Sequence, residues 1–89
     1  MTTAILTTIE SLELGKLLRG LRSDLELTQT DLVEMLCRVR GVSQSWLSNV
    51  ERGYSLPTAG QLEHLLGTYR PTADQCQRAR DLVAAEVLR

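Results

Sequence analysis

Leucine recurs every three or four positions through most of this 89-residue chain, in short segments of which several follow a Thr or Ser. That spacing places the leucines on one face of a helix, since an α-helix turns once in about 3.6 residues. A Thr or Ser before such a segment can cap the helix by accepting a hydrogen bond from a free backbone N–H. With no Phe, one Trp and two Tyr, the core must be mostly leucine. The pattern predicts helices packed on helices.

The expected helices span about residues 10–25, 28–41, 43–52, 58–69 and 72–89. Connections of about two to six residues between them indicate a compact all-α bundle of about five short helices, with a helix-turn-helix formed by the second and third. Residues 1–9 are Thr-rich and show no clear period, so we interpret them as a flexible arm. Residues 10–70 then form the main domain, and residues 71–89 a C-terminal helix for packing or dimerisation.

Apolar residues at helical spacing identify the side chains expected to point inward. They are Leu14, Leu17, Leu18, Leu21, Leu25, Leu32, Met35, Leu36, Val39, Leu47, Val50, Leu62, Leu65, Leu66, Tyr69, Cys76, Ala79, Leu82, Val83 and Val87. Gly15 and Gly20 weaken the first helix, because glycine has a low helix propensity. Tertiary packing must therefore hold that helix in place.

The segment 43–52 differs from the others on its outer face. Ser43 can cap its start and Gly53 can end it, while Leu47, Val50 and Glu51 share one side. The other side carries short or amide-bearing neutral residues, namely Gln44, Ser45, Ser48 and Asn49. A surface that serves only solubility usually carries Lys and Glu, whereas amides can pair with adenine N6 and N7 and hydroxyls with either base. These residues are candidates for contact with DNA bases; the alternative is a solvated helix face.

The charge distribution gives mixed evidence on a nucleic-acid partner. A net charge of −1 counts against nucleic acid. Residues 38–52, however, carry Arg38, Arg40 and Arg52 against Glu51. Nine of the ten basic residues are Arg, which favours fixed, two-pronged contact with phosphate or carboxylate.

Other function classes find little support in the chain. His64 has no metal ligand at suitable spacing except the adjacent Glu63, and no catalytic set or glycine-rich phosphate loop is present, so we expect no enzyme, metal or cofactor. Cys37 and Cys76 stand alone and are expected to be reduced structural residues. Without a membrane span or a basic-apolar leader, the protein is expected in the cytosol.

Several stretches together carry a family resemblance: Leu21-Arg22, Leu27-Thr28-Gln29-x-x-Leu32, Val42 to Gly53, and Pro57-Thr58 with Leu62. They resemble the lambdoid phage repressor and Cro type (XRE-like) of helix-turn-helix regulator over roughly residues 14–69. The tail, with an Arg-rich amphipathic last helix, is similar to regulators of this type common in actinobacteria.

The resemblance implies a role for each matching position. The positions that touch bases in the major groove correspond to Gln44, Ser45 and Asn49, with Ser48 between them. Gln29 matches a residue that grips a DNA phosphate and braces the first residue of the recognition helix. Arg22 and Glu51 match a salt bridge between the first and third helices. Arg52 and the loop after Gly53 match a region that contacts the DNA backbone.

The chain departs from the family by about four extra residues between Gln29 and Glu51. Because four residues make about one helical turn, the preferred interpretation is a second helix elongated by one turn, and a longer connecting loop is the alternative. Either arrangement is expected to bring Arg38 and Arg40 near the recognition helix for phosphate contact. Trp46, where the family usually has a small residue, is expected to pack against the extra turn; contact with DNA sugar or with a protein is the alternative.

The leading hypothesis is a sequence-specific, repressor-like transcription regulator that binds a double-stranded DNA operator as a homodimer and reads the major groove with helix 43–52. Two recognition helices would then lie about 34 Å apart on one face of the duplex. The alternative is a protein-binding module or antitoxin that keeps the helix-turn-helix fold.

Overall fold

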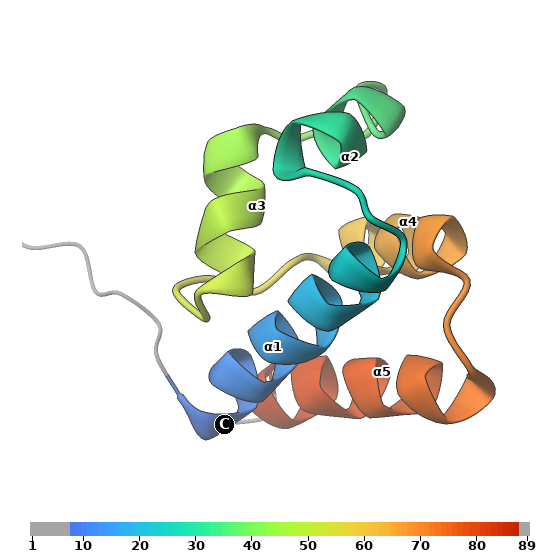
Figure 1. Ribbon diagram of the computed structural model, residues 1–89. Helices are drawn as coiled ribbons and strands as arrows, with labels where there is room; N and C mark the ends of the chain where they lie inside the picture. The colour runs from blue at the N-terminus through green and yellow to red at the C-terminus, as the bar shows by residue number, and fades with distance from the viewer. Residues whose placement is uncertain (1–7, 88–89) are drawn as a thin grey trace, which may run out of the picture.

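The computed structural model describes residues 8–87, which contain five helices and no strand (Figure 1). These helices are α1 (Ile9–Asp24), α2 (Gln29–Met35), α3 (Gln44–Glu51), α4 (Ala59–Tyr69) and α5 (Ala73–Val87). The expected all-α bundle is confirmed. Residues 1–7, most of the predicted arm, lie outside the described residues.

Local capping sets where the helices begin. Thr28 Oγ1 accepts a hydrogen bond from Asp31 N at 3.0 Å, and Asp31 Oδ2 accepts one from Thr28 N at 3.0 Å. Similar reciprocal pairs, Thr58 with Gln61 and Thr72 with Gln75, start α4 and α5, and Ser43 caps α3. Each pair satisfies two backbone N–H groups that the start of the helix would otherwise leave unbonded. A pair that the sequence analysis missed, Thr8 with Ser11, starts α1 at Ile9, inside the stretch predicted as an arm.

The core is built from the predicted inward faces, with α1 packed mainly against α5 and α3 (Figure 1). Its buried members are Leu14, Leu18, Leu21, Leu32, Leu36, Leu47, Val50, Leu62, Leu65, Leu66, Tyr69, Ala79 and Leu82. Three residues expected inside, Leu25, Met35 and Val87, are exposed. Each lies at the last residue of its helix or directly after it. At these positions the side chain is no longer held against the core.

The predicted extension of the second helix is wrong, and the longer connection is present instead. α2 ends at Met35, and residues 36–42 form successive turns, with hydrogen bonds from Val39 N to Leu36 O at 2.9 Å and from Val42 N to Val39 O at 3.3 Å. These tight turns keep Leu36 buried and Val39 half-buried against the core. Gly41 then takes a left-handed conformation with φ of 82°, which reverses the chain toward α3 at little cost for a glycine.

The C-terminal end of α3 is anchored on the start of α1. Ser11, which is 1% exposed, donates a hydrogen bond from Oγ to the carbonyl oxygen of Gly53 at 2.9 Å. Gly53 has a φ of 80°, and a Cβ there would lie 2.9 Å from a methyl carbon of Leu12. Position 53, directly after the Arg52 cap of α3, must therefore be glycine both for its backbone conformation and for space. This anchor sets how α3 is presented to solvent.

Candidate nucleic-acid interface

The two sides of α3 differ as the sequence pattern predicts. Leu47 and Val50 are 0% and 1% exposed and lock the helix to the core. The opposite side is open to solvent: three residues are exposed and Ser48 is half-buried. The three exposed residues are Gln44, Ser45 and Asn49. The neutral hydrogen-bonding groups of α3 are therefore available to a partner.

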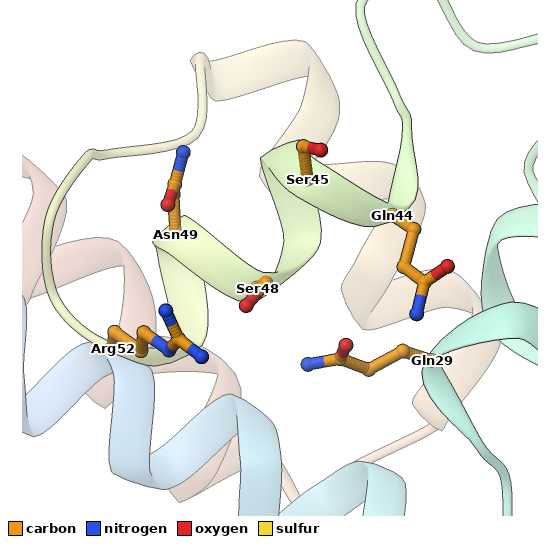
Figure 2. A pocket seen from close by; sticks show the side chains of 6 residues that line it. All are labelled: Gln29, Gln44, Ser45, Ser48, Asn49 and Arg52. Carbon is orange, nitrogen blue, oxygen red and sulfur yellow. The ribbon is translucent and has the colours of Figure 1, made fainter.

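This outer side forms one wall of an open hollow of about 550 Å³, which we call the polar groove. Its lining residues are Gln29, Gln44, Ser45, Ser48, Asn49 and Arg52 (Figure 2). Gln29 extends from the start of α2 toward Arg52, which caps the end of α3, and Gln44 lies across from Gln29 (Figure 2). The lining is polar and includes a cationic group but no carboxylate, so it suits a ligand rich in hydrogen-bonding groups and negative charge.

An ion pair beside the polar groove ties α1 to the end of α3. Arg22 of α1 donates from Nε to Glu51 Oε2 at 2.7 Å and from Nη2 to Glu51 Oε1 at 3.0 Å, the two-pronged geometry of a strong pair. The side chains are only 13% and 4% exposed. The hydrogen bond to Glu51 raises the pKa of Arg22 above its ordinary value, because it stabilises the charged guanidinium.

The same carboxylate also holds α2. Gln29 donates from Nε2 to Glu51 Oε1 at 3.0 Å, and Arg22 donates from Nη1 to the carbonyl of Leu27 at 2.7 Å. Glu51 thus joins three helices, and its position fixes the start of α2 relative to the end of α3. The family resemblance implied that Gln29 braces the first residue of the recognition helix; here its amide nitrogen bonds to Glu51, the last residue of α3.

A comparison with known protein families bears on this geometry, because the matched segment includes the residues of the polar groove and the helices that carry them. A family profile described as a helix-turn-helix domain matches residues 13–81. The chain belongs to this helix-turn-helix family. The match agrees with the resemblance to phage-repressor and Cro-type regulators and supports DNA binding in general terms. Comparisons with curated proteins and with solved structures gave no match.

Within this helix-turn-helix domain, the two arginines of the α2–α3 connection stand apart from the polar groove. Arg38 and Arg40 are exposed but do not line it. The backbone carbonyl of Arg40 accepts a hydrogen bond from Gln61 Nε2 at 3.1 Å, which ties the connection to α4. The phosphate contacts predicted for these two residues therefore remain predictions, whereas Arg52 and Gln29 lie at the groove itself.

Trp46 is half-buried and packs against the core of the helix-turn-helix domain. The extra turn of α2 against which it was expected to pack is absent, because α2 ends at Met35. A different residue was missed by the sequence analysis. Arg19 of α1 is exposed and lines a smaller hollow beside the polar groove. It lies three residues before Arg22, and this spacing places both residues on the same side of a helix; it is the signal from which Arg19 could have been found.

None of the helices described between residues 8 and 87 is long and apolar enough to cross a membrane. In the same part of the chain, no three His, Cys, Asp or Glu side chains lie together as a metal site would require. Cys37 and Cys76 are free thiols, exposed and half-buried respectively.

Proposed function

We propose that this helix-turn-helix protein is a sequence-specific, repressor-like transcription regulator that inserts α3 into the major groove of DNA. The observation that supports this most directly is the outer side of α3, which presents neutral amides and hydroxyls to solvent and is backed by a fully buried apolar side. Such groups can both donate and accept hydrogen bonds, so they can pair with the donors and acceptors that distinguish base pairs in the major groove.

Specific positions receive roles under this proposal. Gln44, Ser45 and Asn49 contact base edges, with Ser48 beside them, because they line the open side of the polar groove. Arg52 and Gln29 contact phosphates at its edge, and Arg38 and Arg40 contact phosphates farther along the duplex. Phosphate contacts position the protein, and base contacts specify the sequence.

The proposed DNA-bound form is a two-fold homodimer. One helix of this length reaches too few base pairs for operator-level specificity, and paired recognition helices of such regulators lie about 34 Å apart. An open, mostly apolar groove between α4 and α5 supplies a candidate contact. Its apolar lining residues are Ala59, Leu62, Val83, Ala84 and Val87. At its rim Arg80 Nε donates to Glu63 Oε2 at 2.9 Å.

Selection of bound duplexes from a random DNA pool tests the proposal as a whole. The expected result is enrichment of a two-fold symmetric site whose half-sites are separated by about one helical turn, or about 10 base pairs. Enrichment of a single half-site would retain sequence-specific binding and reject the dimer. Failure to enrich any sequence, with equal binding to all duplexes or none, would overturn the proposed function.

A further inference from the structure

A second hollow, which we call the arginine pocket, lies beside the polar groove. It is smaller, at about 180 Å³, and more enclosed. Its lining residues are Arg19, Arg22, Gln29, Ser48, Glu51 and Arg52, which come from α1, α2 and α3 and the cap of α3. Gln29, Ser48 and Arg52 line both hollows, so the two form one continuous surface.

The charged side chains of the arginine pocket differ in whether they are paired with another group. Its single carboxylate, Glu51, is already bonded to Arg22 and to Gln29. Neither Arg19 nor Arg52 forms an ion pair or a side-chain hydrogen bond with any residue between 8 and 87. Three guanidinium groups against one carboxylate leave a local excess of positive charge in a chain whose net charge is −1.

The remaining donors suit an oxyanion. Arg19 of α1 and Arg52 at the cap of α3 both line the pocket, and each guanidinium is a planar fork of N–H donors that matches the oxygens of a phosphate. Ser48 also lines the pocket, and its hydroxyl can donate a hydrogen bond as well. Because Glu51 is neutralised by Arg22, its charge does not oppose an anion in the pocket as an unpaired carboxylate would.

We propose that the arginine pocket binds one phosphate of the DNA backbone and that Arg19 is a phosphate-binding residue of this protein. This inference rests on the proposed function, since a duplex seated on the polar groove must carry its backbone past the residues that the two hollows share. Arg19 extends the proposed DNA interface from α2 and α3 onto α1. It adds to affinity without contributing to the choice of sequence.

The test measures DNA binding by Arg19→Gln over a series of salt concentrations, using one random-sequence duplex and one duplex enriched by selection. The expected result is an affinity about tenfold lower on both duplexes, as for the loss of a charged hydrogen bond. The slope of log affinity against log salt should shrink by about one, and the ratio of the two affinities should not change. Arg19→Lys keeps the charge and should retain the slope.

Arg70→Gln is the matched control, because it removes the same charge from an exposed arginine at the cap of α4, outside both hollows. Equal effects of Arg19→Gln and Arg70→Gln would show a net-charge effect and overturn the phosphate pocket. Wild-type affinity in Arg19→Gln would also overturn it while leaving the proposed function intact. If the wild-type chain binds neither duplex, the proposed function fails and this inference fails with it. Thermal unfolding of each variant verifies that it folds.

Discussion

Gly15 of α1 lies directly against the backbone of Glu51 at the end of α3. A Cβ atom at Gly15 would lie 2.4 Å from the carbonyl oxygen of Glu51 and 2.8 Å from that of Val50. Both obstacles are backbone atoms, so no side-chain rotation can relieve the overlap. The glycine that weakens α1 as a helix is therefore the residue that allows α3 to pack closely enough for Glu51 to reach Arg22.

Gly15→Ala is expected to destabilise the fold by about 1–3 kcal/mol, the usual cost of overpacking, because α1 and α3 must separate. Gly20→Ala is the matched control: it lies in the same helix with nothing near a Cβ, and should stabilise the fold by up to about 1 kcal/mol through helix propensity. Urea denaturation measures both free energies of unfolding. Equal shifts in the same direction would show that the close approach does not constrain Gly15.

Because Tyr69 is buried, the free energy of unfolding is expected to depend on pH in the alkaline range. The tyrosine hydroxyl has no hydrogen-bond partner among the described residues, and burial raises its pKa well above the usual 10.0, with Glu51 adding to the shift. A raised folded-state pKa means that this contribution to stability is complete below pH 10.0 and is lost as the pH rises through the folded-state value.

Tyr69→Phe is therefore expected to change the free energy of unfolding by less than about 1 kcal/mol at neutral pH, because no hydrogen bond is lost. Above pH 10.0 the variant should lose less stability than the wild type. Tyr54→Phe, at an exposed tyrosine, should keep the wild-type decline. Urea denaturation at neutral and alkaline pH provides the comparison. An identical alkaline decline in Tyr69→Phe and wild type would contradict the prediction.

Replacement of the proposed base-contacting amides should reduce specificity and not stability. Gln44→Ala or Asn49→Ala is expected to weaken binding to the selected duplex by about 1–3 kcal/mol and leave binding to random DNA unchanged. Gln77→Ala, at an exposed glutamine of α5 outside the groove, should leave binding to both the selected duplex and random DNA unchanged. Titration of labelled duplexes measures the affinities. Equal losses on both duplexes would reject base contact.

The proposed dimer contact is tested on α5. Ala84 lines the apolar groove between α4 and α5, whereas the adjacent Ala85 lines a hollow on the α1 side. Ala84→Glu places a charge in the proposed interface and should lower the dimer fraction in sedimentation equilibrium, together with operator affinity. Ala85→Glu makes the same change outside the interface and should leave the dimer intact. Loss of the dimer in both variants, or in neither, would remove this groove from the interface.

Helix positions and the character of α3 followed from local features of the sequence. Thr28, Thr58 and Thr72 mark the starts of their helices because a cap needs only residues within the next turn. The side of α3 that is buried followed from the spacing of Leu47 and Val50. Exposure of its amides followed in turn, since a helix with one apolar side must present the other to solvent.

Only the tertiary structure decided the features that depend on distances between remote segments. The end of α2 at Met35 was set by how the connection packs on the core and bonds to α4. The bond from Gln29 to Glu51, the need for glycine at position 15, and the presence of Arg19 and Arg52 in one hollow likewise depend on how different helices pack together. Periodicity reports which side of a helix turns inward, but not the depth or angle at which two helices meet. Those are set by side-chain packing across the whole core.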